Sequence, residues 1–308
     1  MTSTKINDES SANQNKKNIK NSNAIVVISD LHVGSIYGLC GDRVVLDGGG
    51  IYRPNKIQKE IFKIWNGFWE FVNDETSNSD SFDIVINGDL IEGYHHDIKC
   101  IWSSNIADQI SAFVDLFYEI FKNNKNLKSK LKDIHIVRGT ESHAGKSCEF
   151  EEILRKILNE KFSKNENTVK ISEYELFLKF GKSETLCHFS HHTSNFSSRF
   201  GEVNSILKEI DSLLLDSIRW NKVKLIPKFI IRSHCHKSCG VEIPMENVNC
   251  KNEKYNKSIV GITTPCWQAK TPYIYKLAIG KNQRSHIGGT ILYEKNNEVG
   301  YKNFVRYI

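Results

Sequence analysis

The sequence predicts an α/β layered fold, in which two β-sheets face each other and helices lie outside them. In the first half, short apolar runs rich in β-branched residues alternate with amphipathic helical patterns, which is typical of layered α/β proteins. In the second half, strand patterns dominate, and we expect them to form a second, more antiparallel sheet. With 308 residues and 39% hydrophobic content, the chain can bury a large core.

Residues 1–23 differ from the rest of the chain. They are rich in Asn, Lys and Ser with almost no apolar content, which predicts a disordered polar tail. No boundary divides residues 24–308, so we expect one domain there. The sequence shows neither the hydrophobic core of a signal peptide nor an apolar run long enough to span a membrane. We therefore expect a cytoplasmic protein without a membrane partner.

The chain is mildly basic. The formal net charge is +6, and the tail holds four Lys against Asp8 and Glu9, so residues 24–308 carry about +4. This balance is compatible with a polyanionic substrate but does not indicate nucleic-acid binding. The eight cysteines lack the spacing of a disulfide scaffold, and we expect reduced thiols. Cys235 and Cys239 flank His236, a pattern that could also suggest zinc.

The first predicted strand, residues 24–29, leads into Asp30-Leu31-His32. A glycine-rich stretch follows, in which residues 43–53 could form a small hairpin or flap above the strand end, or a solvated connection. Residues 55–72 then predict a helix. Its predicted apolar face consists of Ile57, Ile61, Ile64, Trp65, Phe68 and Phe71.

The central strand, residues 82–86, ends in Gly88-Asp89. Gly88 lets the backbone turn, so that Asp89 can project from the end of the strand. An amphipathic helix is predicted at residues 105–121, followed by a strand at 134–137 that leads into Gly139-Thr140-Glu141-Ser142-His143. Two further helices are expected at residues 149–162 and 200–220.

In the second half, residues 168–180 and 184–190 predict a β-hairpin whose second strand leads into His191-His192. A strand at residues 228–233 leads into His234-Cys235-His236. The last predicted strands are residues 258–263, 289–294 and 301–307.

Five predicted strands thus end in residues that commonly bind metals. In layered α/β proteins, ligands bind at the carboxyl ends of the strands. In two of the five motifs, Asp or His alternates with a spacer, so both side chains can face one point from an extended backbone. The sequence therefore predicts a single metal site, and its mixture of imidazoles and carboxylates suits manganese, iron or zinc better than calcium.

The order of these motifs resembles that of the calcineurin-like metallophosphoesterases. Their pattern is Asp-x-His, Gly-Asp, Gly-Asn-His, a later His, and Gly-His-x-His, and the match here runs from residue 25 to residue 236. The chain looks most similar to prokaryotic and phage-type members. The resemblance implies a four-layer αββα sandwich of two mixed sheets flanked by helices, with metals at the strand ends.

The resemblance also implies two divalent metal ions bridged by Asp89, with Mn²⁺ expected first and Fe, Zn, Ni or Mg as alternatives. Thr140 or Glu141 would replace the family's Asn, one of His191 and His192 would bind, and Ser233 stands where the family has Gly. The implied metal ligands are Asp30, His32, Asp89, Glu141, His191, His192, His234 and His236.

The implied reaction is hydrolysis of phosphate mono- or diesters by a metal-bridging hydroxide, with DNA or a nucleotide among the candidate substrates. His143 matches the family's metal-adjacent His and would act as a proton donor to the leaving group. Ser/Thr phosphoprotein phosphatases are disfavoured, because the Gly-Asp motif continues with residues 90–93 instead of their phosphate-binding Arg. The alternative is a catalytically weak metal-binding scaffold or a nucleic-acid-binding protein that retains the fold. The sequence identifies no protein partner.

Overall fold

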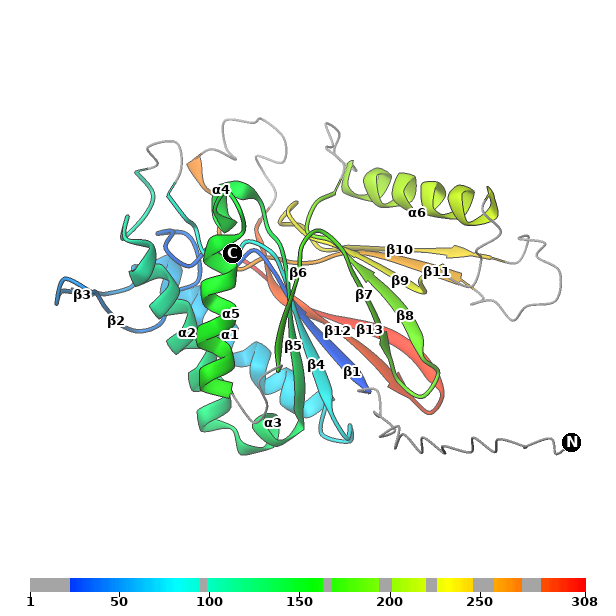
Figure 1. Cartoon of the computed structure of the whole chain (residues 1–308), viewed down its shortest axis with the longest axis horizontal. Helices are drawn as coiled ribbons and strands as arrows, with labels where there is room; N and C mark the ends of the chain where they lie inside the picture. Colours follow the sequence, from blue (N-terminus) through cyan, green and yellow to red (C-terminus); the bar gives the residue numbers. More distant parts are fainter. Residues whose placement is uncertain are drawn as a thin grey trace, which may run out of the picture.

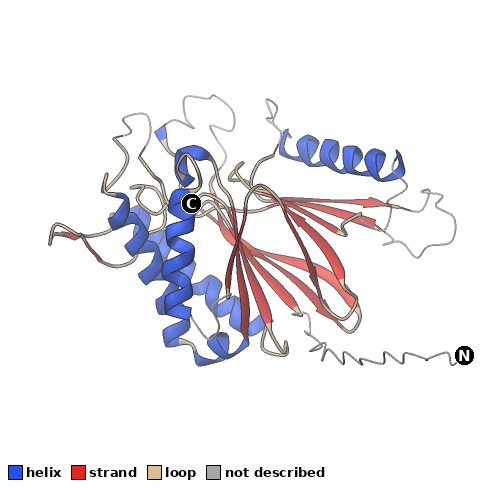
Figure 2. Ribbon diagram, viewed as in Figure 1, coloured by secondary structure: helices blue, strands red, loops and turns tan. Residues whose placement is uncertain are grey.

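Two β-sheets face each other at the centre of the protein, and helices cover the outer face of each (Figure 1). The order of layers is helix, sheet, sheet, helix, which confirms the predicted fold class (Figure 2). The computed structural model describes residues 23–94, 99–162, 168–193, 201–219, 226–245, 258–272 and 284–308.

The first sheet is mixed. Its central strands β1 (Ala24–Ile28) and β4 (Phe82–Asn87) run parallel and are completely buried, as expected for strands covered on both faces. Its strand order is β13 (Glu298–Tyr307), β12 (His286–Lys295), β1, β4, β5 (Leu131–Val137) and β6 (Val169–Ser172).

Four helices cover the outer face of this sheet: α1 (Lys56–Glu75), α2 (Ile106–Asn123), α3 (Lys125–Lys130) and α5 (Glu149–Phe162) (Figure 1). In α1, the predicted Trp65 and Phe68 are buried, whereas Ile57 is 39% exposed. The buried face also includes Trp69, because α2 covers that side of α1 and Phe121 packs 5.4 Å from the Trp69 ring. The apolar stripe is therefore broader than the sequence predicted.

The second sheet has the strand order β10 (Cys239–Pro244), β11 (Ser258–Thr263), β9 (Phe229–Arg232), β8 (Thr185–Phe189) and β7 (Leu176–Phe180). Helix α6 (Gly201–Arg219) covers its outer face (Figure 1). The helix packs closely because Gly261 lacks a side chain. A Cβ at Gly261 would lie 2.2 Å from Cγ2 of Ile206.

The predicted hairpin of residues 168–180 with 184–190 is wrong in its first part. Residues 168–180 divide into two strands, and the first, β6, pairs parallel to β5 in the first sheet. Only β7 pairs with β8 as predicted.

The last two predicted strands, β12 and β13, were expected in the second sheet but belong to the first, where β12 pairs antiparallel to β1. The reason is burial: β12 is buried on both faces, since Ile291 packs toward the helices and Leu292 toward the second sheet. The edge strand β10 was not predicted, because half of its residues are exposed and its apolar pattern is short.

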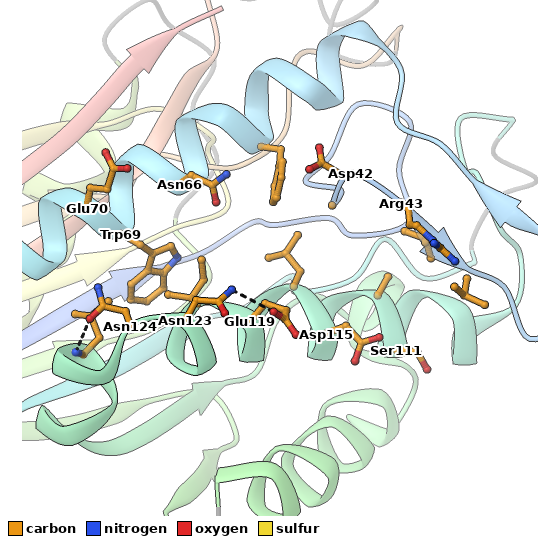
Figure 3. A pocket seen from close by; sticks show the side chains of 18 residues that line it. Asp42, Arg43, Asn66, Trp69, Glu70, Ser111, Asp115, Glu119, Asn123 and Asn124 are labelled. Carbon is orange, nitrogen blue, oxygen red and sulfur yellow. Dashed lines mark hydrogen bonds between the residues drawn. The ribbon is translucent and has the colours of Figure 1, made fainter.

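Residues 43–53 form a hairpin of β2 (Val44–Val45) and β3 (Ile51–Tyr52). It packs beside α2, where the Asp47 N–H donates to Asp108 Oδ1 at 2.7 Å, and it does not overhang the strand ends (Figure 1). A pocket of about 760 Å³ lies between this segment and the helices α1 and α2 (Figure 3). None of the predicted site residues lines that pocket.

Residues 1–22 of the predicted tail lie outside the described residues. Asn23 itself is held in place, since its N–H donates to the Ser81 carbonyl at 3.1 Å and its carbonyl accepts from the Glu294 N–H at 3.1 Å. Within the part of the chain that the structure describes, every helix is too short or too polar to cross a bilayer.

Candidate metal centre

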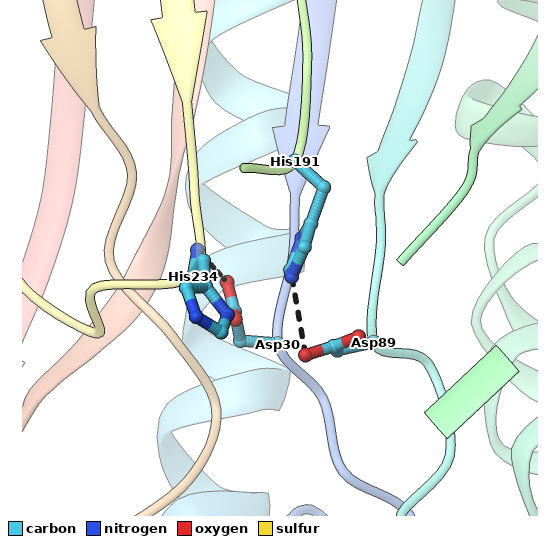
Figure 4. A group of neighbouring side chains, drawn as sticks. All are labelled: Asp30, Asp89, His191 and His234. Atoms are coloured by element: carbon cyan, nitrogen blue, oxygen red, sulfur yellow. Dashed lines mark hydrogen bonds and ion pairs between the residues drawn. The ribbon is translucent and has the colours of Figure 1, made fainter. Parts of the chain in front are cut away.

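Four strands from both sheets end at one place and bring carboxylates and imidazoles together (Figure 4). Asp30 follows β1, Asp89 follows β4, His191 follows β8 and His234 follows β9. Each of these residues offers a ligand atom within 4.8 Å of the others. A neighbouring group that also uses Asp30 contains His32 and His236. The strand-end motifs predicted from the sequence thus form two adjoining groups of candidate ligands.

The backbone turns sharply at these residues. Asp30, His32, Asp89, His234 and His236 have φ values of 52°, 46°, 51°, 68° and 54°. Positive φ is uncommon for residues other than glycine, and such conformations concentrate at functional sites.

His191 is oriented as a metal ligand would be. Its Nδ1 lies 2.7 Å from the Asn87 carbonyl oxygen, which fixes Nδ1–H as the donor. Its Nε2 then faces Asp89 Oδ2 at 3.1 Å, without meeting hydrogen-bond geometry. In a metal-binding histidine, a hydrogen bond from the ring nitrogen that does not bind the metal typically sets the tautomer. Gly88 is required beside it, since a Cβ there would lie 2.2 Å from His191 Nδ1.

Charge complementarity dominates the electrostatics of the centre. Burial would lower the pKa of His191, but the adjacent Asp89 carboxylate raises it to about 9. Burial would raise the pKa of Asp89, yet His191 and His143 hold it well below its usual range. Burial likewise opposes ionisation of Asp30, but the neighbouring His236 lowers that pKa to about 2. Both carboxylates are therefore ionised and buried, and the adjacent His191 and His236 are their positive partners among the described residues.

His32 and His236 form the other side of the centre. Their Nε2 atoms are 3.2 Å apart, and His236 Nε2 also lies 3.2 Å from Asp30 Oδ1. Glu92 orients His32, because its Oε2 lies 3.0 Å from His32 Nδ1. Gln268 holds Glu92 in turn by donating to the same Oε2 at 3.1 Å.

Sequence reasoning did not identify Glu92 or Gln268 as part of the site. Glu92 left a weak signal, a carboxylate three residues after the Gly-Asp motif. Gln268 left none, because it lies in a connection after β11, far in sequence from every motif.

The third motif supports Asp89 from the opposite side. The Thr140 N–H and hydroxyl donate to Asp89 Oδ1 at 2.8 and 3.1 Å. Gly139 leaves room for this contact, since a Cβ there would lie 2.3 Å from the same oxygen. Glu141 is exposed and belongs to none of the candidate ligand groups among the described residues.

His143 is placed beside the centre. Its Nδ1 lies 2.5 Å from the Glu92 carbonyl oxygen, and its Nε2 lies 4.0 Å from Asp89 Oδ2. Burial lowers the pKa of His143, while the nearby Asp89 opposes this shift. The ring thus presents Nε2 to the centre from a fixed position.

His192 lies at the rim. It is exposed, and its ring centroid is 5.3 Å from that of His191 and 5.7 Å from that of His234. Of the two adjacent histidines, His191 is therefore the one directed at Asp89. Neither Cys235 nor Cys239 joins a candidate ligand group in the described part of the chain.

These residues fit a transition metal. Imidazole and carboxylate donors together suit manganese, iron, nickel or zinc. The buried His191 Nε2 faces Asp89 Oδ2 at 3.1 Å without hydrogen-bond geometry, so this nitrogen could be given to an ion that Asp89 also binds. A carboxylate pair buried among histidines is likewise a typical cation environment.

We expect Thr140→Val to lower metal occupancy more than Glu141→Gln. The valine keeps the shape of Thr140 but removes one of its two hydrogen bonds to Asp89, whereas Glu141 points into solvent. Metal content after dialysis against a metal buffer measures the difference. A larger loss in Glu141→Gln would show that Glu141 turns inward to bind an ion.

No family model matches the sequence, and a search of curated proteins found no significant match. Among solved structures, the chain is similar to a predicted phosphoesterase from Streptococcus pneumoniae TIGR4, with 12% identity and a TM-score of 0.30 over 92% of this chain and 98% of that one. It is also similar to a Vps29 double mutant from Entamoeba histolytica, with 10% identity and a TM-score of 0.34 over 92% and 99% of the two chains.

A third similar structure is Vacuolar Protein Sorting 29 from Cryptosporidium parvum, with 10% identity and a TM-score of 0.33 over 94% and 100% of the two chains. Likeness at this level concerns the fold alone. The TM-scores are too low to support a statement about function, for which the side chains at the strand ends remain the basis.

Proposed function

We propose that the protein is a metal-dependent phosphoesterase that hydrolyses phosphate mono- or diesters. The observation that carries this proposal is the position of Asp89 Oδ2 between the two ligand groups. It lies 3.1 Å from His191 Nε2 and 4.0 Å from His32 Nε2. A carboxylate oxygen placed in this way could be shared by two cations, and two-metal phosphate chemistry uses ions held this close together.

In this proposal two divalent ions bind, with Mn²⁺ the first choice. Asp30, His32 and His236 would hold one ion, and Asp89, His191 and His234 the other. The bridging role of Asp89 rests on its Oδ2, which also lies 4.0 Å from His32 Nε2. Two such ions would supply a nucleophile at neutral pH and positive charge for the phosphoryl oxygens. The chain's own residues orient the ligands: Asn87 fixes His191, and Glu92 fixes His32.

His143 is the proposed proton donor to the leaving group. Its Nδ1–H donates to the Glu92 carbonyl, so Nε2 faces the centre. Because burial lowers the pKa of His143, the ring would have to take up a proton at Nε2 before it could give that proton to the leaving group. His143 belongs to a candidate ligand group with His32 and Glu92, but not to the group that contains Asp89. Its position close to Asp89 Oδ2 therefore suits proton transfer better than metal binding.

An assay with p-nitrophenyl phosphate and its bis ester tests the proposal. We expect no turnover after chelation, and restored turnover when Mn²⁺ is added back. Fe²⁺, Zn²⁺, Ni²⁺ and Mg²⁺ are compared in parallel, and DNA and nucleotides are then offered as natural phosphoesters. Absence of turnover with every substrate, in protein that holds its full metal complement, would contradict the enzyme and favour the scaffold.

One observation supports the scaffold as a second candidate. Thr140 stands where the similar family has an Asn ligand, and its hydroxyl donates to Asp89 instead. The second ion would then have fewer protein ligands than the first. A weakly held second ion would lower turnover while leaving a metal-binding fold.

A further inference from the structure

A second group of candidate metal ligands lies at the opposite end of the central strands. Asp83 is at the start of β4, and Asp133 and His135 are on β5. The three residues offer ligand atoms within 4.8 Å of one another. Their neighbours along the strands, Ile84, Ile134 and Ile136, pack in the core that faces the helices. Because side chains alternate along a strand, the three ligand residues lie on the opposite face, between the two sheets, with Val85 and Val137. We propose that this group binds one divalent transition-metal ion of the Zn²⁺ class.

Burial is the first argument. His135 is 5% exposed, although an imidazole is costly to remove from water when its nitrogens are left without hydrogen bonds. His135 Nε2 is buried without a hydrogen-bond partner. An unsatisfied nitrogen on a buried ring that offers a ligand atom within 4.8 Å of two carboxylates needs a physical explanation, and a bound cation supplies one.

The backbone gives the second argument. The pairing of β4 with β5 changes register between Phe82 and Ile84, so the regular ladder is interrupted at Asp83. There the Asp133 N–H donates to the Asp83 carboxylate at 3.2 Å in place of a backbone acceptor. The irregularity brings both carboxylates to the same point, as strand irregularities do beside functional sites.

Lys170 competes for this position. Its Nζ lies 2.8 Å from Asp133 Oδ2, and its side chain is 47% exposed. Exposed ion pairs of this kind contribute little to stability, so the ammonium group can move into solvent when a divalent cation binds. The same lysine indicates that the cluster attracts positive charge.

The donor set favours zinc. One imidazole and two carboxylates with an open fourth position form an ordinary zinc site. A tetrahedral ion with ligands at about 2.0–2.2 Å needs them roughly 3.3–3.6 Å apart, so modest side-chain rotations suffice from the present separations. Asp83 and Asp89 are six residues apart on one extended strand, or about 20 Å, so this ion takes no part in chemistry at the other centre. It would hold β4 to β5 where the ladder is interrupted.

Zinc titration of metal-stripped full-length protein in a competing chelator tests this proposal. We expect Asp83→Asn and His135→Gln each to bind one zinc ion fewer per chain than the wild type. The asparagine retains the acceptor for the Asp133 N–H, which protects the fold. His188→Gln is the matched control, because His188 is another buried strand histidine whose Nε2 makes no hydrogen bond. It lies outside the group, and its Nε2 is 3.6 Å from Glu175 Oε1.

The Lys170→Gln variant gives a test that does not depend on the Asp83→Asn and His135→Gln variants. Removing the competing ammonium should tighten zinc binding at this site by about tenfold, with no change in p-nitrophenyl ester turnover. An unchanged zinc affinity in Lys170→Gln would overturn the proposal even if the other variants fail to fold. An unchanged zinc count in folded His135→Gln would overturn it as well.

Discussion

Asp89→Asn is expected to remove nearly all phosphoesterase activity and to empty both metal sites together. The substitution removes a negative charge that lies 3.1 Å from His191 Nε2 in one ligand group and 4.0 Å from His32 Nε2 in the other, in a side chain that is only 1% exposed. Metal ions contribute several kcal/mol of charge stabilisation to phosphoryl transfer. At about 1.4 kcal/mol for each factor of ten, the rate should fall on the order of 10³-fold or more.

Elemental analysis and bis-p-nitrophenyl phosphate turnover, measured on the same preparation, check this result. Asp115→Asn is a suitable control, because that carboxylate is 73% exposed on α2 and far from the strand ends. A full metal complement in Asp89→Asn would contradict the bridging role. Loss of one ion alone would assign Asp89 to a single site.

His143→Ala is expected to slow hydrolysis of alkyl esters on the order of 10²–10⁴-fold, the usual contribution of a positioned general acid. An alkoxide is a poor leaving group and needs a proton, whereas p-nitrophenolate leaves without one. The loss on p-nitrophenyl esters should therefore be much smaller. Metal content should stay intact, because His143 Nε2 is 4.0 Å from Asp89 Oδ2 and its other nitrogen is held by a backbone carbonyl.

Comparing the two classes of substrate in one variant separates this role from a structural one. A merely structural defect would reduce both rates equally, and a lost ligand would reduce metal content. Either result would show that His143 is not the acid.

The layered fold and the strand ends could be predicted from sequence because they depend on local patterns. The continuous apolar residues of 24–28 directly predict a buried strand. Parallel strands bring their carboxyl ends to one edge of the sheet. Asp30 and Asp89 therefore had to lie close together once β1 and β4 were recognised as neighbours.

What the sequence could not supply depends on contacts between distant segments. Gln268 reaches Glu92 only because the connection after β11 passes beside β4, a path that no local pattern encodes. The choice between Thr140 and Glu141 depended on one turn of backbone, which directs Thr140 at Asp89 and leaves Glu141 in solvent. Likewise, β12 could join either sheet, and only its two-sided burial decides for the first.

The ligands of the strand-end centre come from both sheets, and this couples ion binding to the folding equilibrium. Asp30 and Asp89 belong to one sheet, His191 and His234 to the other, and more than half the chain separates the first from the last. An unfolded chain cannot present such a set, so each bound ion favours the native state. At a free concentration 100 times its dissociation constant, one ion adds about 2.7 kcal/mol to the free energy of unfolding. Bound ions would therefore add to the apolar side chains and to the hydrogen bonds, such as that from His191 Nδ1 to the Asn87 carbonyl, that hold the two sheets together. Metal supply would then raise the free energy of unfolding as well as support the chemistry.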